Sequence, residues 1–131
     1  MANAPLARYS FTKLVVEDLD AMARYYRDVY GLTELQRVKA EIEGAPIEEI
    51  ILGQDGSHAG LILLTWLGQP APPRGEVLLG FTTTDIEALF ARARAAGGTV
   101  REEPAMSDVA GLVVGFVADP EGHVAEVVQH G

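Results

Sequence analysis

The sequence contains no cysteine, which excludes disulfide bridges and any metal site built from thiolates. It has no apolar run near the ~20 residues that a membrane-spanning helix needs, and residues 1–7 lack the charged start and apolar stretch of a signal peptide. Cationic side chains are few, because ten Lys and Arg stand against 19 Asp and Glu, for a net charge of −9. Since the basic residues are also scattered, we expect no nucleic-acid partner. Without a membrane-spanning run or a signal peptide, we expect no membrane association and a cytoplasmic location.

What is present favours one folded domain, since 131 residues at 48% hydrophobic content are enough for a core. Residues 9–17 are rich in β-branched and aromatic types and predict a strand. Apolar side chains then recur at three- and four-residue steps between Asp18 and Gly31, which predicts a helix. The turn residues that follow separate three further strand candidates, near 33–43, 46–53 and 59–67.

A proline-rich linker over residues 68–75 precedes a second pass through the same order of elements. Residues 76–83 predict a strand, and Thr84 with Glu87 forms a capping box that predicts the start of a helix. Three strand candidates follow, near 99–103, 111–118 and 123–129. The sequence therefore predicts a single α+β domain over residues 1–131, with module one at about 9–67 and module two at about 76–129. Each module has the order β-α-β-β-β, and together they are expected to form a curled mixed sheet around a cleft.

Two segments carry a family resemblance. The stretch DLDAMARYYRDVYGL resembles the D-L-x-x-x-x-x-F-Y-x-x-x-L-G signature of the vicinal oxygen chelate superfamily, and FVADPEGHVAE resembles its D-P-x-G-x-x-x-E signature. This superfamily includes glyoxalase I, bleomycin-resistance proteins and extradiol dioxygenases. The resemblance runs from Tyr9 to Gln129 and implies a small-molecule cleft and a homodimer.

The resemblance also implies where a metal site would lie. In the metal-dependent lyases and isomerases of the superfamily, four inward His and Glu side chains hold a divalent ion. Alignment on the signature aspartates places Phe11, Leu63 and Leu79 at three of these positions, and only Glu126 supplies a carboxylate. Because hydrocarbon side chains offer no lone pairs, we expect the usual metal site to be lost and no cofactor to be required.

The histidines are not expected to replace the lost ligands. Strand side chains alternate between faces, and His58 and His123 lie an odd number of residues from Leu63 and Glu126, so both should point away from the cleft. His130 has the right parity but lies beside the end of the sequence. All three are interpreted as surface or turn histidines, and only a one-residue bulge would change this assignment.

Several apolar and aromatic side chains lie on the strand faces that are expected to point into the cleft. They are interpreted as the walls of an apolar, partly aromatic pocket, with the alternative that Leu63 and Leu79 belong to the core. The expected ligand-binding residues are Tyr9, Phe11, Leu63, Thr65, Leu79 and Phe81.

Two charged residues are candidates for catalysis. Lys13 shares a face with Phe11, and Glu126 stands between apolar neighbours, so a bare buried carboxylate there would be costly. Glu126 therefore either contacts a ligand or pairs with Lys13 at the floor of the cleft, or it bonds locally or faces solvent. Other charged stretches are interpreted structurally: Glu41, Glu43, Glu48 and Glu49 as a solvated hairpin tip, and residues 119–122 as a tight turn without a catalytic role.

Two functional hypotheses follow from these residues. The first is a homodimeric protein that binds a small, largely apolar organic molecule without metal. The alternative is a metal-independent lyase or isomerase acting on a small carbonyl compound, with Glu126 as general base and Lys13 stabilising negative charge; lactoylglutathione lyase activity is not expected. The sequence determines neither the ligand nor whether the cleft lies within one chain or across the dimer.

Overall fold

The computed structural model describes residues 6–55, 59–108 and 111–130. The first module contains β1 (Thr12–Val15), α1 (Leu19–Tyr30), β2 (Thr33–Ile42), β3 (Ala45–Gly53) and β4 (Ala59–Trp66). The second module contains β5 (Leu79–Thr82), α2 (Ile86–Ala95), β6 (Thr99–Met106), β7 (Leu112–Ala118) and β8 (Val124–His130).

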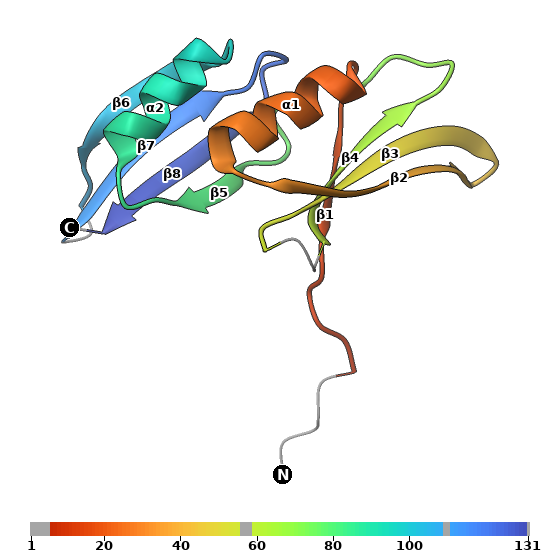
Figure 1. Cartoon of the computed structure of the whole chain (residues 1–131), viewed down its shortest axis with the longest axis horizontal. Coiled ribbons are helices and arrows are strands. Elements are labelled where there is room, and N and C mark those ends of the chain that lie inside the picture. Colours follow the sequence, from red (N-terminus) through yellow and green to blue (C-terminus); the bar gives the residue numbers. More distant parts are fainter. Residues whose placement is uncertain (1–5, 56–58, 109–110, 131) are drawn as a thin grey trace.

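Each module builds its own four-stranded mixed sheet (Figure 1). The strand order is β1-β4-β3-β2 in the first sheet and β5-β8-β7-β6 in the second. In both sheets the first strand runs parallel to the last, and the remaining pairs are antiparallel. The prediction of an α+β fold with two similar β-α-β-β-β modules is confirmed.

Helix α1 begins and ends at the predicted residues. The side chain of Asp18 accepts a hydrogen bond from the backbone N–H of Ala21 at 3.0 Å, which satisfies a free donor of the first turn. Gly31 ends the helix at φ 72°, a left-handed conformation that favours glycine.

Helix α2 is capped in the same way, one residue later than predicted. Asp85, and not Thr84, is the capping residue, because its carboxylate accepts a hydrogen bond from the backbone N–H of Ala88 at 3.0 Å. The hydroxyl of Thr83 accepts a hydrogen bond from the backbone N–H of Asp85, just before the helix. Asp18 and Asp85 thus occupy equivalent positions in the two modules.

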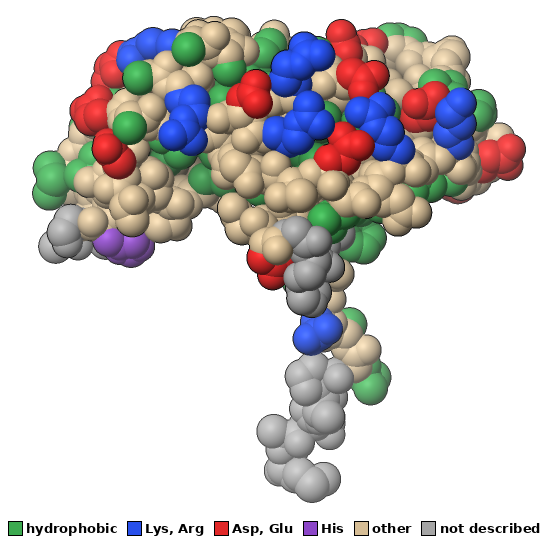
Figure 2. Space-filling view, viewed as in Figure 1, with side chains coloured by type: hydrophobic (Ala, Val, Ile, Leu, Met, Phe, Trp, Pro, Cys, Tyr) green, Lys and Arg blue, Asp and Glu red, His purple; other side chains and the backbone are tan. Residues whose placement is uncertain are grey.

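The helices form one layer and the sheets another. Helix α1 contacts β2, β3 and β4, helix α2 contacts β6, β7 and β8, and the two helices lie side by side (Figure 1). On the face shown in Figure 2, Lys and Arg side chains alternate with Asp and Glu and do not gather into a basic stripe. Among the described residues, no helix has the length and apolar character needed to cross a bilayer.

Candidate functional site

Strand pairing determines which side chains lie beneath the helices. Leu14 of β1 pairs with Leu63 of β4, which also pairs with Ile50 of β3, and all three are buried in the hydrophobic core. Because successive residues of a strand point to opposite faces, Lys13 and its partner Ile62 lie on the other, helix-free face.

Of the two interpretations of Leu63, ligand-lining residue or core residue, the structure agrees with the core, since its exposed fraction is 0%. In the second module, Leu79 and Phe81 also pack against the core, whereas Glu126 pairs with Gly80 on the opposite face of the sheet. Leu79 and Glu126 consequently do not converge on one point. Alignment on a signature gives a position along a strand, but the face of that position depends on pairing with distant strands.

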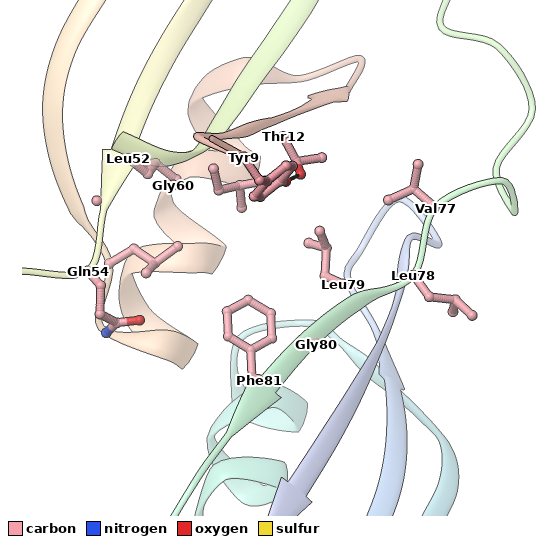
Figure 3. Close-up of a pocket in the computed structure, with 13 residues that line it drawn as sticks. Tyr9, Thr12, Leu52, Gln54, Gly60, Val77, Leu78, Leu79, Gly80 and Phe81 are labelled. Carbon is pink, nitrogen blue, oxygen red and sulfur yellow. Dashed lines mark hydrogen bonds between the residues drawn. The ribbon is translucent and has the colours of Figure 1, made fainter. Parts of the chain in front are cut away.

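A pocket of about 380 Å³ lies between the two modules. Its walls come from the segment before β1, from β1 itself, from the adjoining ends of β3 and β4, and from β5 with the residues before it (Figure 3). We call it the inter-module pocket. The side chains that line it include those of Tyr9, Thr12, Gln54, Leu61, Leu79 and Phe81. Among the described residues that line it, none carries a formal charge.

An aromatic stack supports one wall of the inter-module pocket. The ring of Phe81 lies 3.7 Å from the ring of Tyr30 between centroids, at an interplanar angle of 12°. Tyr30 in turn stacks on Tyr26 at 5.7 Å and 20°. Phe81 projects from β5 into the pocket, on the side opposite Tyr9 (Figure 3).

The structure brings only some of the expected ligand-binding residues to this pocket. Tyr9, Leu79 and Phe81 line it, and the hydroxyl groups of Tyr9 and Thr12 are hydrogen-bonded to each other. Phe11 is 44% exposed and lies outside the lining. Thr65 also lies outside it, and its hydroxyl donates a hydrogen bond to the backbone carbonyl of Glu17 at 3.4 Å.

The two candidate catalytic residues are not paired with each other. Lys13 Nζ lies 2.6 Å from Glu49 Oε2, and Glu49 is buried at 6% exposure on β3. The interpretation of Glu49 as part of a solvated hairpin tip is therefore wrong. Glu126 is partly exposed on the helix-free face of β8, and no described side chain pairs with it.

A buried polar cluster joins the second module to α1 and β1 of the first module. It consists of Asp119 and His123 from the turn between β7 and β8, and Tyr26 from α1. His123 Nδ1 lies 2.8 Å from Asp119 Oδ2, the Tyr26 hydroxyl donates to the same oxygen at 2.8 Å, and His123 Nε2 lies 3.0 Å from the carbonyl oxygen of Val15. We call these three residues the Asp119 cluster.

The turn prediction for residues 119–122 is confirmed by a hydrogen bond from Gly122 N–H to the Asp119 carbonyl at 2.9 Å. His123 directly follows this turn, and of the two interpretations, surface or turn, the surface one is wrong, because its exposed fraction is 7%. A sequence signal was available in the four-residue spacing of Asp119 and His123 around this turn. His130 is exposed at the end of β8, and His58 lies outside the described residues.

Burial and mutual contacts shift the pKa values of all three members of the Asp119 cluster. Burial acts to raise the pKa of Asp119, but hydrogen bonds from His123 and Tyr26 outweigh it and lower that pKa below its usual value. Burial acts to lower the pKa of His123, and the neighbouring carboxylate of Asp119 reverses this effect and raises it. Burial, with the charge of Asp119, raises the pKa of the Tyr26 hydroxyl, so this group remains a donor.

The described residues do not fit a four-ligand metal centre. A divalent ion needs nitrogen or oxygen lone pairs converging at about 2.0–2.2 Å, and within residues 6–55, 59–108 and 111–130 no three His, Cys, Asp or Glu side chains are grouped to hold one. At the family positions, Phe11, Leu63 and Leu79 offer no lone pair, and Glu126 lies on the face opposite Leu79.

Comparisons with known proteins agree on one family. The family description that matches residues 8–127 is the Glyoxalase/Bleomycin resistance protein/Dioxygenase superfamily. Lactoylglutathione lyase from Haemophilus influenzae is 30% identical over 124 residues, which cover 91% of this chain and 90% of that protein. Lactoylglutathione lyase GLX1 from Arabidopsis thaliana is 31% identical over 120 residues, and the match spans 88% of this chain but 42% of the plant protein.

A solved structure shows the same fold. The crystal structure of a glyoxalase family protein from Bacillus cereus superposes with a TM-score of 0.83 and covers 99% of this chain and 98% of that one, at 19% identity. Since the arrangement of both modules is shared, the inter-module pocket lies in a framework that another chain also adopts.

Proposed function

Because the chain belongs to the glyoxalase/bleomycin resistance protein/dioxygenase superfamily, we propose that it binds a small, largely apolar organic molecule in the inter-module pocket. The observation that carries this proposal is the pocket itself, about 380 Å³ in volume with aliphatic and aromatic walls. Pockets of this kind bind small molecules through burial, and a few polar groups orient the ligand. Thr12 and Gln54 supply such groups here.

The proposal includes binding without a divalent ion. Three of the four family positions carry the hydrocarbon side chains of Phe11, Leu63 and Leu79, and the described lining of the inter-module pocket contains no charged group. Elemental analysis of purified protein, with and without added Ni²⁺ or Zn²⁺, tests this part. A stoichiometric ion that survives dialysis and is lost in Glu126→Ala would overturn it.

The binding proposal is tested with the neutral fluorescent probe N-phenyl-1-naphthylamine. Leu79→Arg places a cation in the uncharged pocket, and we expect the probe affinity to fall by about tenfold or more, because burying an unpaired charge is costly. Leu67→Arg is the matched control, since Leu67 is 42% exposed and lies outside the pocket. Equal probe affinities in the two folded variants would contradict the assignment of the site.

A second candidate function is catalysis on a small carbonyl compound. It is favoured by relatives named lactoylglutathione lyase that the chain matches over most of its length. In this alternative Glu126 is the general base, because it is partly buried and no described cation neutralises it. Lys13 is less suited to stabilise an oxyanion, because Glu49 already neutralises its charge. An assay for the formation of S-lactoylglutathione from methylglyoxal and glutathione, with and without Ni²⁺, distinguishes the binding function from the catalytic one. Metal-stimulated turnover would replace the binding proposal.

The proposal also places the protein in the cytoplasm as a homodimer. Large apolar side chains are exposed immediately before the edge strands β1 and β5, where Phe11 is 44% and Leu78 is 64% exposed. Such side chains on neighbouring edges favour association with a second copy. Light scattering after size exclusion should give twice the mass of 14.0 kDa, and Leu78→Glu should shift the protein towards the monomer.

A further inference from the structure

The walls of the inter-module pocket carry information about the class of ligand. We infer that this pocket selects an uncharged, planar aromatic molecule of one or two fused rings, which stacks on Phe81. The inference rests on the proposed function, because it names the ligand class for the same site.

The first support is the fixed position of Phe81. One side of its ring is packed against Tyr30, and Tyr30 is stacked on Tyr26, so the three rings form a continuous stack. Tyr26 is itself fixed by its hydrogen bond to Asp119 at 2.8 Å. A ring that is already immobilised loses little rotational freedom when a ligand stacks on it, which strengthens binding.

The second support is that Phe81, the ring at one end of the stack, borders the pocket. Phe81 is partly exposed and lines the pocket, and in Figure 3 its ring projects into the open space between β5 and the strands of the first module. A planar ligand lying over the face of Phe81 that Tyr30 does not cover would extend the series of rings by one member. Offset-stacked rings are favoured beyond the burial of their area, and this preference distinguishes a flat ring from an aliphatic one of similar size.

The third support is charge. The described lining contains no Asp, Glu, Lys, Arg or His, so an ionised ligand would lose water without gaining a counter-ion. The polar side-chain groups of the described lining are the amide of Gln54 and the mutually hydrogen-bonded hydroxyl groups of Tyr9 and Thr12, which suit a hydroxyl or carbonyl group on the ligand.

The fourth support is size. A volume of about 380 Å³ lies near the lower end of the range of about 300–1,000 Å³ typical of small-molecule pockets. This volume suits a bicyclic molecule better than a long peptide-like ligand such as a glutathione adduct.

Three probes of nearly equal size separate the elements of the inference. They are 2-naphthol, which is planar and neutral, decahydro-2-naphthol, which is neutral but not planar, and 2-naphthoate, which is planar and anionic. By calorimetric titration of wild-type protein at pH 7, 2-naphthol should bind about 2–12-fold more tightly than decahydro-2-naphthol. 2-Naphthoate should bind about tenfold or more weakly than 2-naphthol.

Substitutions at Phe81 connect these preferences to the ring. Phe81→Leu should bring 2-naphthol and decahydro-2-naphthol to within about twofold of each other, and Phe81→Tyr should keep the wild-type preference because it keeps the ring. Phe116→Leu is the matched control on β7, since Phe116 lies outside the pocket, and it should leave the preference unchanged. Circular dichroism establishes that each variant is folded.

The outcomes distinguish this inference from the proposed function. If decahydro-2-naphthol binds as tightly as 2-naphthol to the wild-type protein, or Phe81→Leu keeps the preference, the inference is overturned and the binding proposal stands. If 2-naphthoate binds best, the requirement for a neutral ligand is overturned. If none of the three probes binds, the proposed function fails and the inference fails with it.

Discussion

The Asp119 cluster should be a major source of stability, and Asp119→Ala tests this directly. The carboxylate accepts hydrogen bonds from the Tyr26 hydroxyl at 2.8 Å, from the backbone N–H groups of Glu121 and His123 at 2.9 and 3.0 Å, and it pairs with the ring of His123. Removing it leaves these donors without their acceptor at the contact between the modules.

The size of the effect follows from burial. The Asp119 side chain is 0% exposed and that of His123 is 6% exposed, so water cannot replace the lost contacts without opening the structure. With His123 protonated the two side chains form a buried ion pair, and removing one partner of such a pair costs about 3–5 kcal/mol. For a chain of this size the midpoint of thermal unfolding should fall by about 10–25 °C.

Urea denaturation followed by circular dichroism measures the free energy of unfolding. Asp119→Asn retains an acceptor oxygen but no charge, and we expect an intermediate loss of about 1.5–3 kcal/mol. Asp28→Ala on the exposed side of α1 is the control and should change stability by less than about 0.5 kcal/mol. If Asp119→Ala costs no more than this control, the cluster does not hold the modules together and the reasoning is refuted.

Other contacts give further measurable outcomes. The pKa of His123 is higher in the folded protein than its value of 6.5 in the unfolded chain, so protonation of His123 stabilises the fold. This stabilisation is complete below pH 6.5 and is lost as the pH rises through the higher folded pKa. The free energy of unfolding should therefore fall from pH 6 to 9, and it should fall by less in His123→Gln. Lys13→Met should cost about 1–3 kcal/mol in urea denaturation by leaving Glu49 buried and unpaired, and adding Glu49→Leu should recover most of it. Gly115→Ala should cost about 1–3 kcal/mol in the same assay, because its new Cβ would lie 2.7 Å from the ring of the buried Phe90.

The order of elements is predictable from the sequence because it depends on local periodicity. The apolar stripe between Asp18 and Gly31 places α1 within its observed bounds. The capping signals place the start of α1 at Asp18 and the start of α2 within one residue of its observed cap, Asp85, before any long-range contact is known. Caps and stripes involve neighbours within one or two turns, so a short window contains the whole signal.

The faces of the strands are not predictable in the same way. Alternation shows that Phe11 and Lys13 share a side, but whether that side faces a helix depends on pairing with β4, about fifty residues further along the chain. Glu49 looks like a solvated residue until β1 places Lys13 beside it. His123 is similarly buried because Val15 and Tyr26 come from the other module.

The residues of the family signature have a structural role in this chain. In the D-P-x-G turn, Asp119 organises its own backbone and bonds Tyr26 of the first module. The carboxylate of Glu121 accepts hydrogen bonds from the backbone N–H groups of Glu17 and Asp18 at 2.9 and 2.7 Å, immediately before α1. These contacts dock one module on the other and require no ligand or metal. A match to this signature consequently predicts how the modules are arranged, whereas the ligand depends on the separate set of side chains that line the inter-module pocket.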